Sequence, residues 1–257
     1  MTVPEDDAAW LQLIREGMPP FWRSIAERSG GSIWEDRDVV AAVFPMAPER
    51  SFFNSVFYED GDRLLASLDR IAAAYEQAGV RAWTVWVPET EEPVARGLAD
   101  AGHLLDAEPR AMAMEISELR PPDPDEAIEL REHPDMAEVA RLNEIAYGWA
   151  PGEFEAVGRS AGADTFAYFA SMDGETVGTA VAWHYGHDAQ IAWVATLPEA
   201  RGRGVASQLT ARAVAEAGGR GRRTTTLVAT QLGRPVYEKL GYRDFGAVQM
   251  WERRRPK

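Results

Sequence analysis

The alternation of apolar and polar positions predicts an α/β protein. Apolar residues recur with a helical period over 63–77, 136–147 and 205–217. Shorter helices are expected at 93–101, 152–159 and 235–240, and 7–28 reads as a helix in two pieces because Pro19-Pro20 interrupts it. Continuous or alternating apolar runs predict strands at 32–34, 39–44, 51–58, 83–87, 111–116, 128–131, 166–172, 177–185, 190–196, 225–229 and 247–252.

This order of elements divides the chain into two similar halves. The stretch Pro121-Pro122-Asp123-Pro124-Asp125 is the most linker-like in the sequence, so we expect domains at 1–118 and 126–257 with a linker at 119–125. The segment Leu98–His103 followed by Ala111–Met114 parallels Tyr237–Tyr242 followed by Ala247–Met250. The parallel favours a diverged internal repeat.

Composition narrows the classes of function. The 257 residues carry a net charge of −14, and an acidic surface disfavours binding to nucleic acid or to anionic membranes. No cysteine is present, which excludes thiolate catalysis and disulfides, and the four histidines show no metal-binding spacing. The acidic N-terminus does not resemble a signal peptide, and no apolar run approaches a membrane span. We therefore expect a cytoplasmic protein without a metal.

A glycine-punctuated arginine loop carries the clearest chemistry. The strand at 190–196 leads through Pro198 into Arg201-Gly202-Arg203-Gly204, and a helix follows from Val205. Gly202 and Gly204 leave room for a ligand against the backbone. The unpaired N–H groups at a helix N-terminus attract phosphate. The loop is thus expected to hold the pyrophosphate of a nucleotide-containing cofactor, and the two arginines add positive charge.

Residues 128–253 resemble the GCN5-related N-acetyltransferase (GNAT) family. The signature Arg/Gln-x-x-Gly-x-Gly/Ala is met by Arg201-Gly202-Arg203-Gly204-Val205-Ala206. A later family segment, a tyrosine on a short helix before Leu-Gly-Phe/Tyr, is met by Tyr237-Glu238-Lys239-Leu240-Gly241-Tyr242. The resemblance implies an α/β fold of two GNAT-like domains, each with a mixed, mostly antiparallel central sheet flanked by helices.

The resemblance also implies acetyl-CoA as cofactor and a role for particular residues. Tyr237 would be the general acid that protonates the departing thiolate, which a phenol can do. Thr230 stands where the family often has asparagine, so one polar contact is altered. The expected contacts to the cofactor are the pantetheine-aligned Val194, Ala195 and Thr196, the pyrophosphate loop Arg201, Gly202, Arg203, Gly204, Val205, Ala206 and Ser207, and also Thr230 and Arg234.

The first half lacks these features. In place of the arginine–glycine loop it has Tyr58-Glu59-Asp60-Gly61-Asp62-Arg63, whose carboxylates would repel a pyrophosphate, and Leu98 matches Tyr237. The first half is therefore expected neither to bind acetyl-CoA nor to catalyse. We expect it to support packing and to form one wall of the acceptor pocket.

The acceptor and its base are less defined. The base could be Glu144, His184 or a chain of water molecules. The structural alternatives are that Glu144 lies on a solvated helix face and that His184 is a hydrogen-bonded histidine at the edge of the sheet. Tyr147, Trp149 and Trp183 are candidate contacts for a partly apolar acceptor, although core packing explains aromatics equally well. The expected activity is direct acetyl transfer to a primary amine of a small molecule or peptide N-terminus, by a monomer or homodimer. The alternative is a non-catalytic acyl-CoA sensor or scaffold.

Overall fold

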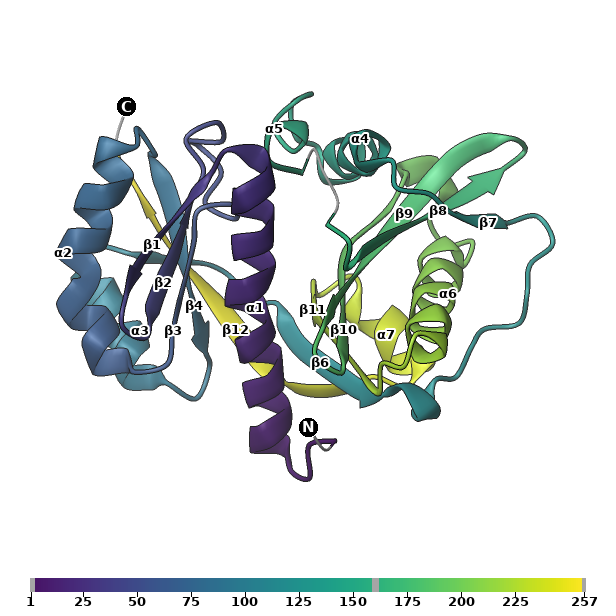
Figure 1. Ribbon diagram of the computed structural model, residues 1–257, viewed down its shortest axis with the longest axis horizontal. Helices are drawn as coiled ribbons and strands as arrows, with labels where there is room; N and C mark the ends of the chain where they lie inside the picture. The colour runs from purple at the N-terminus through teal and green to yellow at the C-terminus, as the bar shows by residue number, and fades with distance from the viewer. Residues whose placement is uncertain (1–2, 159–161, 256–257) are drawn as a thin grey trace.

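In the computed structural model, which describes residues 3–158 and 162–255, helix α1 (Asp7–Ser29) stands between two groups of strands (Figure 1). The first half continues with β1 (Ser32–Asp36), β2 (Val39–Val43), β3 (Ser55–Tyr58), α2 (Gly61–Gln77), β4 (Ala82–Pro88), α3 (Glu92–Asp100), β5 (Leu104–Ala107), β6 (Arg110–Glu115) and a 3₁₀ turn (Ile116–Glu118).

The second half repeats this pattern of strands and helices. It comprises β7 (Glu129–Glu132), α4 (Met136–Tyr147), α5 (Glu155–Gly158), β8 (Thr165–Met172), β9 (Glu175–Tyr185), β10 (Asp188–Thr196), a 3₁₀ turn (Pro198–Ala200), α6 (Val205–Gly219), β11 (Thr224–Ala229), α7 (Arg234–Leu240) and β12 (Arg243–Arg254). The unit β10–α6–β11–α7 thus matches β3–α2–β4–α3, and in both units the two strands are parallel neighbours.

The strands form one path of mixed but mostly antiparallel pairing, which confirms the expected fold class. Their order is β1-β2-β3-β4-β12-β6-β11-β10-β9-β8-β7, with β5 beside β12. Strand β6 of the first half pairs with β11 along its whole length, while Val248–Arg254 of β12 pairs with β4. The two halves therefore exchange their last strands, so the linker 119–125 separates them in sequence but not in hydrogen bonding.

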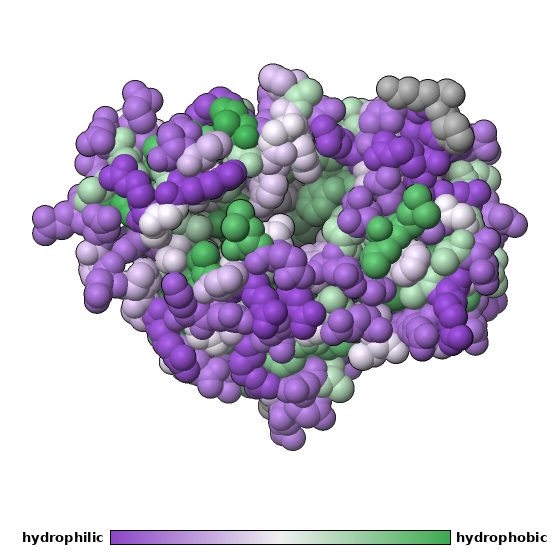
Figure 2. Space-filling model, turned by 180° about the vertical axis from the view of Figure 1, so that it is seen from behind, coloured by the Kyte–Doolittle hydropathy of each residue, from purple (hydrophilic) through white to green (hydrophobic). Residues whose placement is uncertain are grey.

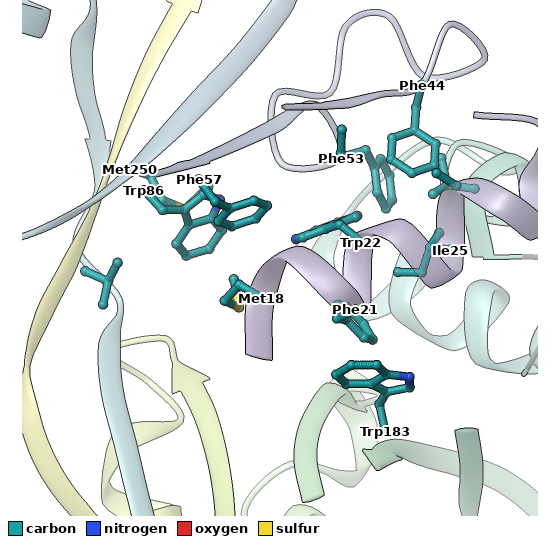
Figure 3. Close-up of a cluster of buried hydrophobic side chains, with 14 of the residues drawn as sticks. Met18, Phe21, Trp22, Ile25, Phe44, Phe53, Phe57, Trp86, Trp183 and Met250 are labelled. Carbon is teal, nitrogen blue, oxygen red and sulfur yellow. The ribbon is translucent and has the colours of Figure 1, made fainter. Parts of the chain in front are cut away.

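Helix α1 is continuous, so the expectation of two pieces was wrong. Pro19 and Pro20 lie inside the helix and cannot donate to the carbonyls of Arg15 and Glu16. Buried side chains on both sides of the prolines hold the helix together, because tertiary packing contributes most of a helix's stability. Phe21 packs against Trp183 of the second half and Trp22 against Phe53 of the first (Figure 3).

Three further expectations are corrected by the structure. Strand β3 begins at Ser55 rather than 51, because the buried Asn54 side chain accepts from Phe44 N–H (2.8 Å) and donates to the Ala47 carbonyl (3.0 Å), which fixes a turn. Strand β5 was missed, since its residues are mostly exposed and carry no alternation. The helix expected at 152–159 is confined to Glu155–Gly158, and Arg159 lies outside the described residues.

Candidate active site

The backbone N–H groups from Gly202 to Ser207, at the start of α6, form an open anion-binding site, which we call the anion seat. Gly204 is the N-cap with φ +80°, and no side chain caps the helix. Within the described residues, no acceptor is found for the backbone N–H groups from Gly202 to Ser207. A Cβ added at Gly202 or Gly204 would meet no atom within 4 Å. The backbone donors, the helix dipole and the open space together suit a pyrophosphate.

The equivalent helix of the first half is already capped. The Asp60 carboxylate accepts from the N–H groups of Asp62 (2.9 Å) and Arg63 (3.1 Å) at the start of α2. A carboxylate in this position occupies the seat that a phosphate would need. The contrast between Asp60 and Gly204 distinguishes the two halves chemically.

Strands β10 and β11 separate beside the open seat. They pair only from Asp188 to Ile191 and from Thr224 to Leu227. Beyond Ile191 the backbone of β10 turns at Trp193, whose φ is +52°, and its register with β9 shifts between Ala192 and Ala195. A bulge of this kind re-aims a strand. Val194, Ala195 and Thr196 therefore continue toward the seat without pairing with β11.

The arginines around the loop differ in what they contact. Arg201 donates to the carbonyls of Ala146 (2.7 Å) and Thr196 (3.3 Å), so its side chain fastens the loop to the ends of α4 and β10. Arg203 is exposed and makes no ion pair or hydrogen bond within the part of the chain that is described. Arg234 is engaged by Glu238 and Asp244, and the Thr230 hydroxyl accepts from Gly233 N–H.

Tyr237 of α7 is buried beside the separated strands. Its ring packs edge-on against Tyr242 and lies next to Thr230 and Gly233. Burial, with a smaller effect of the nearby Tyr147 hydroxyl, holds the pKa of Tyr237 well above its ordinary value. No hydrogen bond to its hydroxyl is found among the described residues. Tyr237 is therefore protonated at neutral pH, with its proton uncommitted.

The Glu144 carboxylate, a candidate base, is engaged by backbone donors. Its carboxylate is 6% exposed and accepts from the backbone N–H groups of Gly152 (3.0 Å), Phe154 (2.8 Å) and Glu155 (3.1 Å). These donors belong to the segment that follows α4. The Glu144 carboxylate thus holds this segment against α4, and both of its oxygens accept hydrogen bonds from it. The neighbouring Ile145 is 46% exposed.

We expect Glu144→Gln to destabilise the fold by about 2 kcal/mol, because an amide can accept at only one of its two ends and its NH₂ would face donors. Urea denaturation measures the loss, with Glu138→Gln as control, because Glu138 lies partly exposed on the same helix and pairs with Arg141. At saturating acceptor, kcat should stay within about threefold and keep the shape of its pH profile. Loss of the acidic limb of that profile would restore Glu144 as the base.

His184, the other candidate base, lies near the C-terminal end of α6 and far from the anion seat. Its ring contacts Phe166 (4.5 Å between centroids), and Arg220 lies over the same Phe166 ring. Arg220 caps the C-terminal end of α6, whereas the anion seat is at its start, 15 residues and about 22 Å away. Burial, with the charges of Arg222 and Arg220, lowers the pKa of His184 to about 4.

A histidine with a lowered pKa makes stability depend on pH. The unfolded chain binds a proton near pH 6.5 and the folded chain only near 4, so stability is full above pH 6.5 and falls as pH drops toward 4. We expect His184→Phe to remove this dependence. Between pH 8 and pH 5 the wild type should lose about 1–2 kcal/mol relative to the variant in urea denaturation, with turnover unchanged. An equal loss in both proteins would contradict the assignment.

A cavity of about 320 Å³ opens beside Tyr147 and the β10 bulge. Trp149 lines it, as expected, and Tyr147 donates from its hydroxyl to the Val194 carbonyl (3.1 Å). Trp183 is not among the described lining residues, because its ring packs against Phe21 and Tyr185 in the core. Seen from behind, the molecule is hollowed between its two halves (Figure 2).

Most of the residues that form the cavity wall were not identified from the sequence. Both α1 and the first-half strands reach it, through Met18, Phe21, Trp22, Phe52, Trp86 and Met250 of the shared strand β12. The aromatic residues of α1 lie on more than one face of the helix, which was the available signal. No local pattern shows, however, that a first-half helix approaches second-half strands.

Residues 163–244 match the family model of the acetyltransferase (GNAT) domain. This part of the chain is therefore a GNAT domain. The matched region includes the arginine–glycine loop and Tyr237, and the chain is accordingly an acyltransferase of the GNAT type. The matched GNAT domain supports a general acetyl-transfer function.

Solved structures share the fold over most of the chain. A GCN5-related N-acetyltransferase from Kribbella flavida is 19% identical, with 91% of this chain and 96% of that chain covered at a TM-score of 0.66. One from Sphaerobacter thermophilus is 17% identical over 99% and 98%, at 0.62. A tandem GNAT protein from the clavulanic acid biosynthesis pathway is 14% identical over 85% and 79%, at 0.58. Among curated proteins, no sequence matches.

The described chain also has no helix that is both long and apolar enough to cross a bilayer.

Proposed function

We propose that this protein transfers the acetyl group of acetyl-CoA directly to a primary amine that is held between its two halves. The observation that supports this most is the uncapped start of α6, which lies at the end of the same bulged strand whose Val194 carbonyl is bound by Tyr147. Tyr147 in turn lies close enough to Tyr237 to influence its pKa. Tyr147 also lines the cavity, so the proposal places the anion seat, the acid and the cavity next to one another.

The residues present fit acetyl-CoA. The N–H groups from Gly202 to Ser207 would donate to the pyrophosphate, and exposed Arg203 would add charge. The backbone from Val194 to Thr196 would pair with the amides of the pantetheine arm, because it lacks β11 as a partner. The Thr230 hydroxyl already accepts from Gly233 N–H, which leaves its own O–H and one lone pair for the cofactor.

Bound acetyl-CoA supplies an acetyl thioester. The cavity holds the acceptor so that its neutral nitrogen forms a bond to the acetyl carbon while the carbon–sulfur bond breaks. Tyr237 gives its hydroxyl proton to the departing sulfur and regains one from solvent. The surplus proton of the amine leaves through water, since Glu144 already accepts backbone N–H groups and His184 lies far from the anion seat.

In this proposal only the second half, 126–257, carries a catalytic site, and the first half, 1–118, serves it as a wall. Asp60 fills the anion seat of α2, and Leu98 stands where Tyr237 stands in the second half. In the first half, β3 and β4 pair only at Ser55 and Val56 of β3, and Arg15 of α1 binds beside the end of β3. It donates to the Tyr58 carbonyl (2.9 Å) and pairs with Glu91 (2.8 Å).

Calorimetric titration with acetyl-CoA, followed by thiol release in the presence of a panel of primary amines, tests the proposal. We expect binding in the micromolar range and amine-dependent release of free thiol. No binding at millimolar acetyl-CoA would overturn the proposal. Binding without turnover of any amine would favour the non-catalytic acyl-CoA sensor.

A further inference from the structure

The walls of the 320 Å³ cavity are aromatic and nearly free of charge. The rings of Trp22, Phe52, Trp86, Trp149 and Phe154 line it from both halves. Among the described lining residues, Glu108 is the one carboxylate, and none is lysine, arginine or histidine. Glu108 is exposed, and its carboxylate accepts from Gln249 (3.0 Å). The ionic character of the cavity is thus confined to its rim.

This lining discriminates among classes of amine. An acceptor that carries a carboxylate, such as an amino acid, would lose hydration without finding a counter-charge. A polyamine would bury several positive charges against one rim carboxylate. A single amino group on an apolar body loses little, because it attacks in its neutral form, and its body gains by burial against the rings.

Two buried amides beside the cavity each carry an oxygen atom without a hydrogen-bond donor among the described residues. Asn143 donates to the carbonyls of Val139 (2.9 Å) and Trp193 (3.3 Å), which fixes its orientation and leaves Oδ1 without a donor in the described chain. Gln190 contacts the Met18 sulfur through Nε2, and its Oε1 likewise has no donor there. Both residues line the cavity. Unsatisfied acceptors beside a cavity favour a ligand with N–H groups.

We propose that the acceptor is an arylalkyl monoamine without a carboxylate, whose ring packs against Phe52 and Trp86 in the cavity and whose amino group faces Tyr147. The proposal rests on the proposed function, because it places the amine in the same site. The first half then determines specificity as well as stability. Arg50 supports this wall by lying over the Trp149 ring (5.0 Å) and pairing with Glu153.

Binding of three amines to the enzyme saturated with coenzyme A tests the proposal without requiring turnover. The probes are 2-phenylethylamine, phenylalanine, which adds a carboxylate, and spermidine. Tryptophan fluorescence and calorimetry report the dissociation constants. We expect 2-phenylethylamine to bind at least tenfold more tightly than either of the others. Equal or tighter binding of phenylalanine or spermidine would overturn the proposal, whereas failure of the proposed function would show as tight amine binding with no thiol release from acetyl-CoA.

Variants of the wall provide the second readout. Trp86→Leu should weaken 2-phenylethylamine at least tenfold and leave acetyl-CoA affinity unchanged. Trp34→Leu is the matched control, because Trp34 packs under Arg70 and does not line the cavity. Phe52→Arg, on a partly exposed turn, adds the missing counter-charge and should lower the preference for 2-phenylethylamine over phenylalanine at least tenfold. An unchanged preference in folded Phe52→Arg would contradict the assignment of this wall.

Discussion

Replacing Tyr237 with phenylalanine is expected to lower kcat by about 10²- to 10⁴-fold while acetyl-CoA affinity stays within about twofold. The ring and its packing against Tyr242 survive in the variant, so only the proton is lost. Stopped-flow thiol release and calorimetry measure the two quantities separately. A kcat within threefold of the wild type would remove Tyr237 from the acid role.

Tyr242→Phe is the matched control for this experiment. Tyr242 is also buried, but its hydroxyl shares a hydrogen bond with Thr225 (2.8 Å) and is thereby committed to the core. The control should lose stability and keep its turnover. The raised pKa of Tyr237 adds a pH test: because the hydroxyl remains protonated beyond its ordinary range, kcat should show no loss from tyrosine ionisation below about pH 10.

Replacing Gly204 with aspartate is expected to weaken acetyl-CoA at least about 100-fold, or about 3 kcal/mol. The new carboxylate would stand at the N-cap of α6, as Asp60 stands at the N-cap of α2, and would occupy the N–H groups that the pyrophosphate needs. Repulsion between the two anions adds to the loss. Calorimetry with acetyl-CoA and with inorganic pyrophosphate measures it.

Two controls separate charge from backbone strain. Gly204→Asn has nearly the same shape and tolerates positive φ, but it carries no charge and should lose much less affinity. Gly174→Asp adds the same residue at another open glycine, with φ +84°, in the turn between β8 and β9. It should not alter acetyl-CoA affinity. If Gly204→Asp binds acetyl-CoA as the wild type does, the anion seat lies elsewhere.

Local chemistry could be predicted from the sequence where it depends on neighbours in the chain. The glycines at 202 and 204 adopt the positive φ that only glycine accepts readily, and α6 begins at Val205 as expected. Helix α4 has the predicted bounds, since its apolar period and its ends are local. The acidic residue at the corresponding place in the first half, Asp60, caps the start of α2, which is likewise a local interaction.

Features that depend on distant pairing could not be predicted in this way. The segments Ala111–Met114 and Ala247–Met250 have similar apolar patterns, so nothing local decides that β6 joins β11 and that β12 reaches β4. Glu144 is polar and sits among apolar neighbours, and only the later fold of 152–155 supplies the three donors that bury it. The cavity depends on both facts and on the path of α1.

The central claim is that two similar halves provide one acetyl-CoA site. Calorimetric titration of the wild-type chain with acetyl-CoA measures the stoichiometry directly. The account predicts one equivalent bound per chain, and none bound by Gly204→Asp at the same concentrations. Two equivalents per chain, or one equivalent retained in Gly204→Asp, would contradict it.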